Sequence, residues 1–463
     1  MPVLSFETPC QRHPQVIVLH FQLVQPAHLI LIPLAFRAFI FTRDRTRARW
    51  DLSEWSILAF IALQGVSSYL FAANLKLSVL SAGLLMLGVV AYLATFVSVC
   101  DRARLVFAGR AVLLVGLASA AVGIAELAAF YLFHSHFGVV TGKQAGSSAP
   151  VVAGLAFENN IYGSFSASAA IAFLVLSRER NPLFSRRFSV FGLAVCFVAM
   201  VISLTRAAWV GFAVAAIALV ILRRRRAPRR NRVLQIGLVS FALAAVALGV
   251  FGMILTGAGE TLPKTVASTG SQLFNLNSGS GQARASEWRL ALADWKKNPM
   301  LGLGTNSYGQ RHLAPKKSPH SPAGKQAAYL GNLYIRALYD SGILGLLFLL
   351  IFILAVLWPM VPLRHSGGDL AAVARAFLFG YATLMVAFAG TDASFQPWPW
   401  ILAGVARAAS SQAVRQSLQR ATGPFRRNEW TGQRVPAAIG AVAGGGMALR
   451  SQPGPQGGAN GPS

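Results

Sequence analysis

Long apolar runs separated by short polar connections dominate the pattern of this chain. A helix that crosses a lipid bilayer needs roughly 20 predominantly apolar residues. Eleven stretches approach that length and composition: 16–41, 55–73, 78–99, 111–133, 160–177, 188–204, 206–222, 233–257, 341–361, 373–390 and 396–411. The pattern therefore predicts an all-α polytopic membrane protein with about eleven transmembrane helices.

Positive charge alternates between the connections. Every second connection is basic, and the longest basic run begins at Arg223. Apart from the basic stretch 258–340, the connections between them carry almost no positive charge, with Lys76 alone in one and Lys143 alone in another. Basic loops remain on the cytoplasmic side of a membrane. The segments predicted to lie outside are 134–159, 204–206, 258–340 and 391–395. Eleven spans would also put the N-terminus outside, which is unusual, and a mis-assigned or re-entrant first stretch would repair the parity.

Two segments depart from the pattern and define the predicted organisation. The polytopic domain covers residues 1–411, and within it residues 258–340 form an outer loop too long to be a simple connection. Residues 412–463 are basic and then rich in glycine and proline, so we expect a disordered cytoplasmic tail.

The outer loop contains one helical pattern, ARASEWRLALADWKKNP at 283–299. Trp288, Leu292 and Trp295 recur at helical spacing, and Pro299 ends the pattern. This spacing predicts an amphipathic helix lying on the outer membrane surface. The following segment, GLGTNSYG at 302–309, is predicted to be a turn.

Composition agrees with a membrane protein and excludes a nucleic-acid partner. The 463 residues are 54% hydrophobic and only 12% charged, about half the charged fraction of a soluble domain. The net charge of +27 comes largely from arginines in short connections, whereas nucleic-acid binders gather basic residues on a soluble face. The three cysteines show no spacing that indicates a metal site or a disulfide.

Arginines at the outer boundary are the candidate functional residues. Arg284 and Arg289 lie in the loop helix, and planar guanidinium groups bind phosphate oxygens in pairs. The alternative is a solvated helix face attracted to anionic lipid. Arg206, in SLTRAAWVGF, is flanked by apolar residues, where a charge costs about 2–3 kcal/mol. It either holds an anion or extends to the lipid headgroups. Asn160, in GLAFENNIYG, binds substrate or caps a helix.

Three segments resemble the O-antigen ligase and O-antigen polymerase superfamily. They are SLTRAAWVGF, ARASEWRLALADWKKNPMLGLGTNSYG and GNLYIRALYDSGILGLL, and the resemblance extends over about residues 150–400. Each motif is short and unspecific alone, but their order and their predicted side of the membrane agree with the family.

The resemblance implies a GT-C-like glycosyltransferase of the inner membrane, with its site facing the periplasm. Such enzymes transfer a glycan from undecaprenyl diphosphate to a hydroxyl group and need no metal or nucleotide cofactor. Arg206 and Arg284 match the family's arginines, and Arg289 is a nearby second candidate. The lipid bilayer and the lipid-linked glycan are the expected partners. A polysaccharide chain-length regulator is a candidate protein partner.

One departure from the family pattern favours a polymerase over a ligase. The ligases carry a histidine before the asparagine of the third segment, and this chain has Gly331 before Asn332. His320, His312 and Asp340 remain candidate bases. Asn332 and Arg336, in the same segment, are candidate substrate-binding residues.

Two other classes of protein remain open. A transporter would show polar residues near the midplane and matching halves, whereas the polar residues singled out above lie near the predicted outer boundary and no matching halves are detected. A structural scaffold for cell-wall assembly fits the topology but leaves Arg206 without a role.

Overall fold

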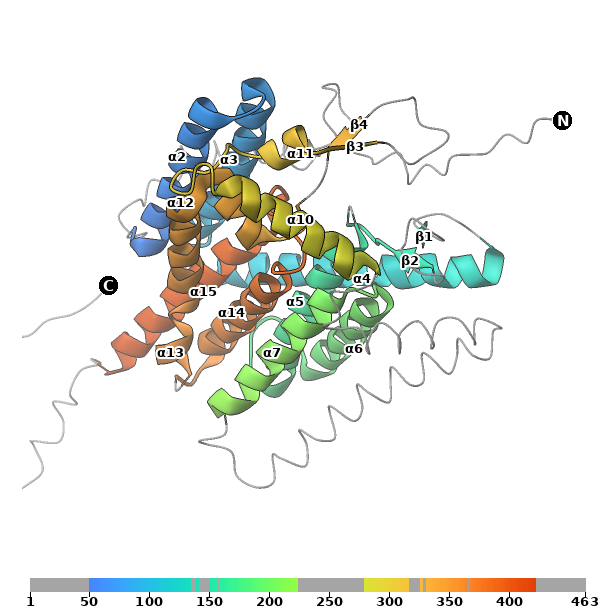
Figure 1. The fold of residues 1–463 in the computed structure, drawn as a ribbon. Coiled ribbons are helices and arrows are strands. Elements are labelled where there is room, and N and C mark those ends of the chain that lie inside the picture. Colours follow the sequence, from blue (N-terminus) through green and yellow to red (C-terminus); the bar gives the residue numbers. More distant parts are fainter. Residues whose placement is uncertain are drawn as a thin grey trace, which may run out of the picture. The chain divides into compact units, whose positions relative to one another are not determined.

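The computed structural model describes residues 50–134, 139–140, 150–156, 158–223, 279–315, 325–327, 330–364 and 366–421 (Figure 1). The chain divides into two compact units, 1–418 and 419–463, and the account below concerns the first. The expected spans 16–41 and 233–257 lie outside the described residues, as does the predicted tail from residue 422 onward.

The described residues are mainly helical. The helices are α2 (Leu52–Phe71), α3 (Leu75–Ser98), α4 (Arg102–Phe133), α5 (Asn159–Arg178), α6 (Arg186–Ile202), α7 (Arg206–Arg223), α10 (Gly279–Trp295), α11 (Ser307–Arg311), α12 (Leu333–Leu357), α13 (Met360–Leu363), α14 (Asp369–Ala387) and α15 (Pro397–Ala421). Two short antiparallel pairs join β1 (Val139–Val140) to β2 (Val151–Val152) and β3 (Leu313–Pro315) to β4 (Lys325–Ala327).

Six segments of the described chain are long and apolar enough to cross a membrane. They are α2, α3, α4, α5, α14 and the stretch Leu333–Leu363 that contains α12 and α13. The remaining expected spans among the described residues coincide with α6, α7 and α15, of which α7 is a shorter apolar helix. An all-helical, polytopic membrane architecture is therefore supported, and the total of eleven spans stays a prediction. Helix α15 continues to Ala421, past the expected end of the last span at residue 411.

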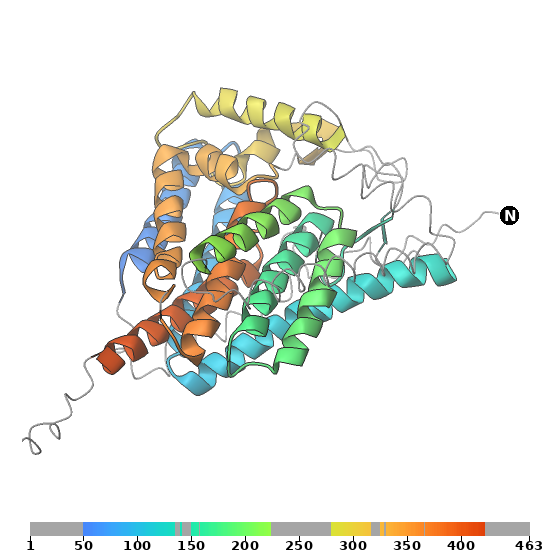
Figure 2. The same cartoon turned by 90° about the horizontal axis from the view of Figure 1, so that it is seen from below.

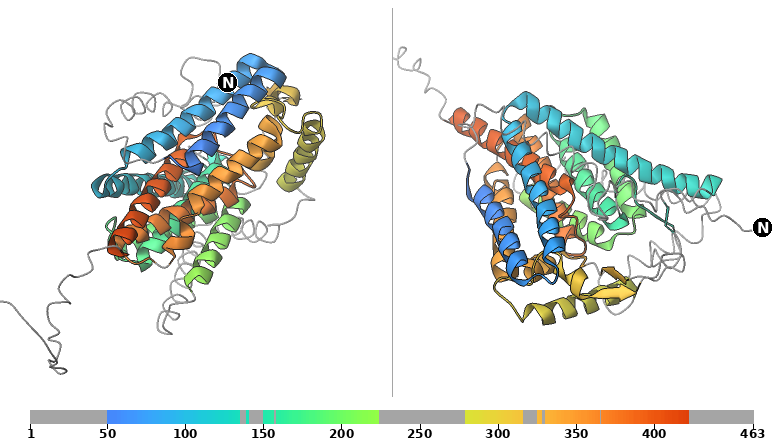
Figure 3. Two further views of the ribbon diagram at one scale, coloured as in Figure 1. Left: turned by 90° about the vertical axis from the view of Figure 1, so that its left-hand side faces the viewer. Right: turned by 90° about the horizontal axis from the view of Figure 1, so that it is seen from above.

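Helices α5 and α14 form the centre of the bundle. In each of these helices, 83% of the most apolar 18-residue stretch is buried, compared with 28% for the segment that begins with α12. Helix α5 packs against α6, α14, α7 and α4, while α2 packs against α3 and α12 (Figure 3). Because most of the surface of α12 faces away from the other described helices, it is suited to contact with lipid.

Helix ends that the charge pattern assigns to one side of the membrane are joined to one another. On the predicted cytoplasmic side, the amide of Gln412 donates to Val99 O at 2.8 Å, and Arg110 Nε donates to Leu183 O at 2.8 Å. On the predicted outer side, the hydroxyl of Thr205 donates to Asn159 O at 3.1 Å. The two sets of ends are thus consistent with the predicted alternation, and the second set is called the outer end below.

Helix α10 lies across the outer end of the bundle and packs against α12 (Figure 2). The predicted helix exists, but its Trp288 face is not turned only to the membrane surface. Trp288 packs against a cluster made by Ala291, Leu303, Tyr308, Leu330 and Tyr339. The residues after α10 fold back beneath it and supply Leu303 and Tyr308, which the helical pattern alone does not reveal. Leu290 and Leu292 remain exposed.

Candidate functional site

The segment that follows α14 is the meeting point of three helices at the outer end. Phe388 O accepts from the amide N–H of Leu333 at 3.0 Å, and Ala389 O accepts from Asn332 Nδ2 at 2.7 Å. Gly390 O accepts from Arg284 Nη1. These three successive carbonyl groups, called the carbonyl row below, fix the start of α12 and the first half of α10 to one short segment.

The start of α7 meets the same segment and carries Arg206. Leu204, in the preceding turn, has a left-handed backbone with φ of 54°, a conformation that costs energy for a residue with a Cβ. A Cβ built on Gly390 would lie only 2.7 Å from Ala207 Cβ, so α7 and the carbonyl row approach as closely as a glycine permits. This contact places the start of α7, which carries Arg206, next to Gly390, whose main-chain oxygen binds Arg284.

Arg206 and Arg284 lie close enough for their like charges to interact. Partial burial makes the positive charge on Arg206 less favourable, and the positive charge of Arg284 adds to that effect. Both side chains are partly exposed. Two neighbouring guanidinium groups can both donate to the oxygens of one anion, and each such charge-assisted bond is strong. The arrangement is therefore suited to an anionic ligand with several oxygen acceptors.

A carboxylate lies one helical turn from Arg284. Glu287 is partly exposed, and its main-chain oxygen accepts from the Tyr308 hydroxyl at 3.4 Å. Burial raises the pKa of Glu287, while the charge of Arg284 opposes that rise. The cation pair is thus bordered by a group able to take up a proton, although the sequence pattern did not single it out.

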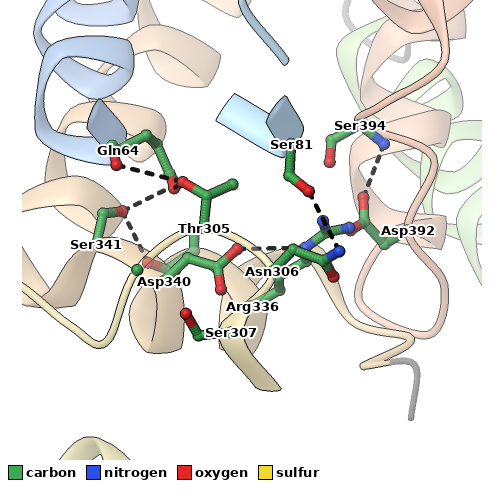
Figure 4. Close-up of polar contacts among 12 residues, drawn as sticks. Gln64, Ser81, Thr305, Asn306, Ser307, Arg336, Asp340, Ser341, Asp392 and Ser394 are labelled. Atoms are coloured by element: carbon green, nitrogen blue, oxygen red, sulfur yellow. Dashed lines mark hydrogen bonds and ion pairs between the residues drawn. The ribbon is translucent and has the colours of Figure 1, made fainter. Parts of the chain in front are cut away.

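Arg336 and Asp340, two of the predicted site residues, are buried in an ion cluster with Asp392 (Figure 4). Arg336 Nε lies 3.4 Å from Asp340 Oδ2, and Nη1 bonds to Asp392. The guanidinium also stacks 3.7 Å from the ring centre of Phe395. The three charged side chains are 8%, 3% and 0% exposed, respectively. These contacts favour a supporting role for both residues, while substrate binding by Arg336 and base catalysis by Asp340 stay predictions.

Helix α12 is interrupted at Gly342, whose φ is 69°. The residues after α10 bond to the backbone on both sides of the break. Before it, Tyr339 O and Asp340 O accept from the N–H groups of Leu303 and Gly304, at 2.8 and 3.0 Å. After it, the N–H of Ile343 donates to Pro299 O at 2.9 Å. Backbone groups left by a broken helix need such partners inside a membrane.

Three glycines make this close docking possible. Gly302 and Gly304 have φ of 75° and 94°, a region that favours glycine. A Cβ on Gly302 would lie 2.6 Å from the backbone of α12, and one on Gly342 would lie 2.2 Å from Met300 O. The glycines of the second and third family-like segments therefore meet one another. The predicted turn at 302–309 is a mostly buried segment that braces the interrupted helix α12, and it is called the splint below.

Polar side chains of α2 complete the attachment of this splint (Figure 4). The hydroxyl of Ser67 donates to Asp340 O at 2.7 Å and accepts from the N–H of Gly304 at 2.9 Å. Gln64 accepts from the Thr305 hydroxyl at 2.6 Å and donates to Ser341 at 3.1 Å. Sequence reasoning missed this role. The available signal was the recurrence of Gln64 and Ser67 on one face of an apolar helix.

The other predicted site residues are not brought to the cation pair, or are occupied elsewhere. Arg289 is exposed, and its position five residues after Arg284 turns it to another side of α10. The amide of Asn160 donates to Glu158. Asn332 caps α12, accepting from the N–H groups of Tyr334 and Ile335 at 2.9 and 3.0 Å. His320 lies outside the described residues.

His312, a further candidate base, pairs with Asp294 at 2.7 Å. Ten residue steps along α10 separate Asp294 from Arg284, or about 15 Å at about 1.5 Å per residue. The histidine is therefore placed near the far end of α10 from the cation pair.

Comparison with known proteins agrees with the family-like segments. No curated protein matched the chain. Residues 191–350, which include Arg206, Arg284, Arg336 and Asp340, match the family model described as O-antigen ligase. Proteins of this ligase or polymerase type assemble surface polysaccharide in membranes. The match supports the resemblance of residues 191–350 to the O-antigen ligase and O-antigen polymerase superfamily.

Proposed function

We propose that the protein is a glycosyltransferase of the inner membrane that builds surface polysaccharide, such as O-antigen or exopolysaccharide, at the periplasmic face. Its donor is a glycan linked to undecaprenyl diphosphate. The observation that supports this most is the neighbouring pair Arg206 and Arg284 at the outer end of apolar helices. A lipid diphosphate combines the charge that suits this pair with a tail that suits the bilayer.

The backbone adds to the attraction for an anion. Helices α5 and α7 begin at Asn159 and Arg206, both at the outer end. The first turn of a helix carries unpaired N–H groups and a partial positive charge, which favour phosphate. Fixed cations and N–H groups stabilise the charge that develops on the leaving diphosphate, which is usually the largest contribution to catalysis of this kind.

Polymerisation is favoured over ligation by the residue before Asn332. Gly331 is buried and supplies no imidazole where the ligases have one. His312 is paired with Asp294 near the other end of α10. Ligation to the lipid A core is the second candidate, and a polymerase would be expected to work with a chain-length regulator.

Transfer by the purified protein tests this proposal. Liposomes containing the protein and a lipid-diphosphate glycan, without nucleotide or ion gradient, should accumulate longer lipid-linked glycans. Products on a lipid A core acceptor would favour the ligase. Movement of unmodified glycan-lipid across the bilayer, with no new glycosidic bond, would instead favour a transporter and contradict the proposal.

Chemical labelling tests the proposed orientation. In a cysteine-free background, a cysteine replacing the exposed Lys296, directly after α10, should react with an impermeant maleimide from outside. A cysteine replacing the exposed Arg187 at the start of α6 should react only after the membrane is opened. The reverse result would put the cation pair on the cytoplasmic side, away from the proposed donor.

A further inference from the structure

Glu287 of α10 borders the cation pair, and no role has been assigned to it above. We propose that its carboxylate is the general base that removes the proton from the acceptor hydroxyl. The inference rests on the proposed function, because it supplies the proton acceptor that glycan transfer to a hydroxyl requires.

The geometry of α10 brings Glu287 to the cation pair. Arg284 and Glu287 are three residues apart on the helix Gly279–Trp295, so their side chains project from the same face, with Cβ atoms about 5–6 Å apart. The Glu287 main chain is held by the Tyr308 hydroxyl, which fixes this turn of α10 on α11. A partly exposed carboxylate is thereby presented beside the site proposed for the diphosphate.

The other acids of the described outer end are committed to partners. Asp340 and Asp392 are buried around Arg336. Asp294 binds Lys297 and His312, about 15 Å along α10 from Arg284. Glu158 accepts from the amide of Asn160. Glu287 is the acid whose main electrostatic partner is a residue of the cation pair.

Donor binding would strengthen Glu287 as a base. Burial already raises its pKa, and Arg284 limits the rise. Among the described residues, Arg206 on α7 interacts electrostatically with Arg284, and the Tyr308 hydroxyl on α11 interacts with Glu287. A diphosphate bound to the two arginines would offset their positive charge, so the pKa of the carboxylate would rise further. The base would then be most basic when the donor is present.

The step balances without any other reactant. The acceptor oxygen forms a bond to the anomeric carbon as the bond from that carbon to the phosphate oxygen breaks. The acceptor proton passes to the Glu287 carboxylate. The bonding electron pair leaves with the lipid diphosphate, whose charge is held by Arg206 and Arg284. Glu287 later returns the proton to water.

Comparing transfer to two nucleophiles distinguishes a catalytic base from a residue with a structural role. Azide carries no proton to remove, so transfer to azide needs no base, whereas transfer to a sugar hydroxyl does. Glu287→Gln should lower hydroxyl transfer by roughly 10²–10⁴-fold and leave transfer to azide unchanged. Donor binding and membrane abundance are measured for each variant. Asp294→Asn, on the same helix, is the matched control and should leave the ratio of the two reactions unchanged.

Equal losses with both nucleophiles, or full hydroxyl transfer by Glu287→Gln, would overturn the assignment. Wild-type protein that transfers to neither nucleophile would reject the proposed function itself, so the two failures are distinct. Should Glu287→Gln not accumulate, Glu287→His provides a second test. As the pH is lowered, hydroxyl transfer by this variant should begin to fall at a higher pH than in wild type, near the imidazole pKa of about 6.5. If the low-pH side of the pH–rate profile does not shift relative to wild type, the assignment is also overturned.

Discussion

Arg336 and Arg284 lie at the same end of the bundle and belong to two different kinds of charge site. The guanidinium of Arg336 is buried between Asp340 and Asp392, so its charge is already balanced. Arg284 binds a neutral carbonyl, Gly390 O, and lies near the like charge of Arg206. The comparison indicates that one arginine holds the scaffold together while the other is positioned to gain from an anion.

The two sites are linked through one short segment. Residues 388–390 hold the start of α12 and Arg284, and Asp392, two residues later, holds Arg336. A change in the buried cluster should therefore disturb the cation pair, whereas a change in the cation pair should leave the buried cluster intact. The predictions below test this asymmetry.

The largest effect is expected from Arg336→Met. This change leaves Asp340 and Asp392 buried without their shared cation, and breaking a buried pair typically costs about 3–5 kcal/mol. Thermal unfolding in detergent and abundance in the membrane measure the loss. A matched change at the exposed surface, Lys296→Met, should be close to neutral. Normal stability of Arg336→Met would remove the distinction between the two sites.

The next effect concerns activity rather than stability. Arg206→Lys and Arg284→Lys should each reduce glycan transfer by roughly 10²-fold or more, because an ammonium cannot replace a planar fork on a diphosphate. Membrane abundance should stay normal in both. Near-normal transfer would mean that both arginines only extend to lipid headgroups, where lysine serves equally well. Loss of membrane abundance in Arg206→Ala or Arg284→Ala would instead make these two residues structural.

A smaller, pH-dependent effect is expected at the other end of α10. Burial raises the pKa of Asp294, but hydrogen bonds from Lys297 and His312 lower it more, so the net pKa is below its usual value. A carboxyl whose pKa is lowered by folding stabilises the fold above its unfolded pKa of about 4, and this is lost as pH falls further. The stability difference between wild type and Asp294→Asn should shrink below about pH 4. A constant difference would show that the ion pair is not responsible.

The smallest effect is expected from Gly331→His. A histidine at this position should not by itself create ligase activity, because a base needs hydrogen-bond reach and a suitable environment as well as the right residue type. The measurement is decoration of a lipid A core acceptor, with the parent protein as control. New decoration by the variant alone would show that one side chain separates the two activities.

The hydrophobic pattern predicted most of the helices, and the exceptions have physical causes. Helix α12 begins at Leu333, before the expected span 341–361, and its interruption at Gly342 lies where that span was expected to begin. The charges of Arg336 and Asp340 lower the hydropathy of its first turns, so these turns were assigned to the loop. A hydropathy scale scores each residue separately and takes no account of ion pairs between them. The orientation of Trp288 was likewise hidden, since its packing partners come from the segment that follows the helix.

The candidate site was predicted in part. Family-like segments identified Arg206 and Arg284, but their proximity depends on Gly390, far along the chain from both. The carbonyl row could not be predicted from residue types because every residue has a carbonyl. Glu287 stood within a recognised segment, and only the fold of α10 gave it a cation as a neighbour.

The interruption of α12 has a consequence for how the chain is made. Its backbone partners, Pro299 to Gly304, precede α12 in sequence, so they are synthesised before the helix that needs them. Gln64 and Ser67 of α2 are synthesised earlier still, and their polar groups must wait for the splint. We expect the outer loop to dock only after α12 has been inserted, which makes this docking a late event in biogenesis. Loop mutations at Gly302 or Gly304 should therefore yield inserted but immature protein that cellular quality control removes.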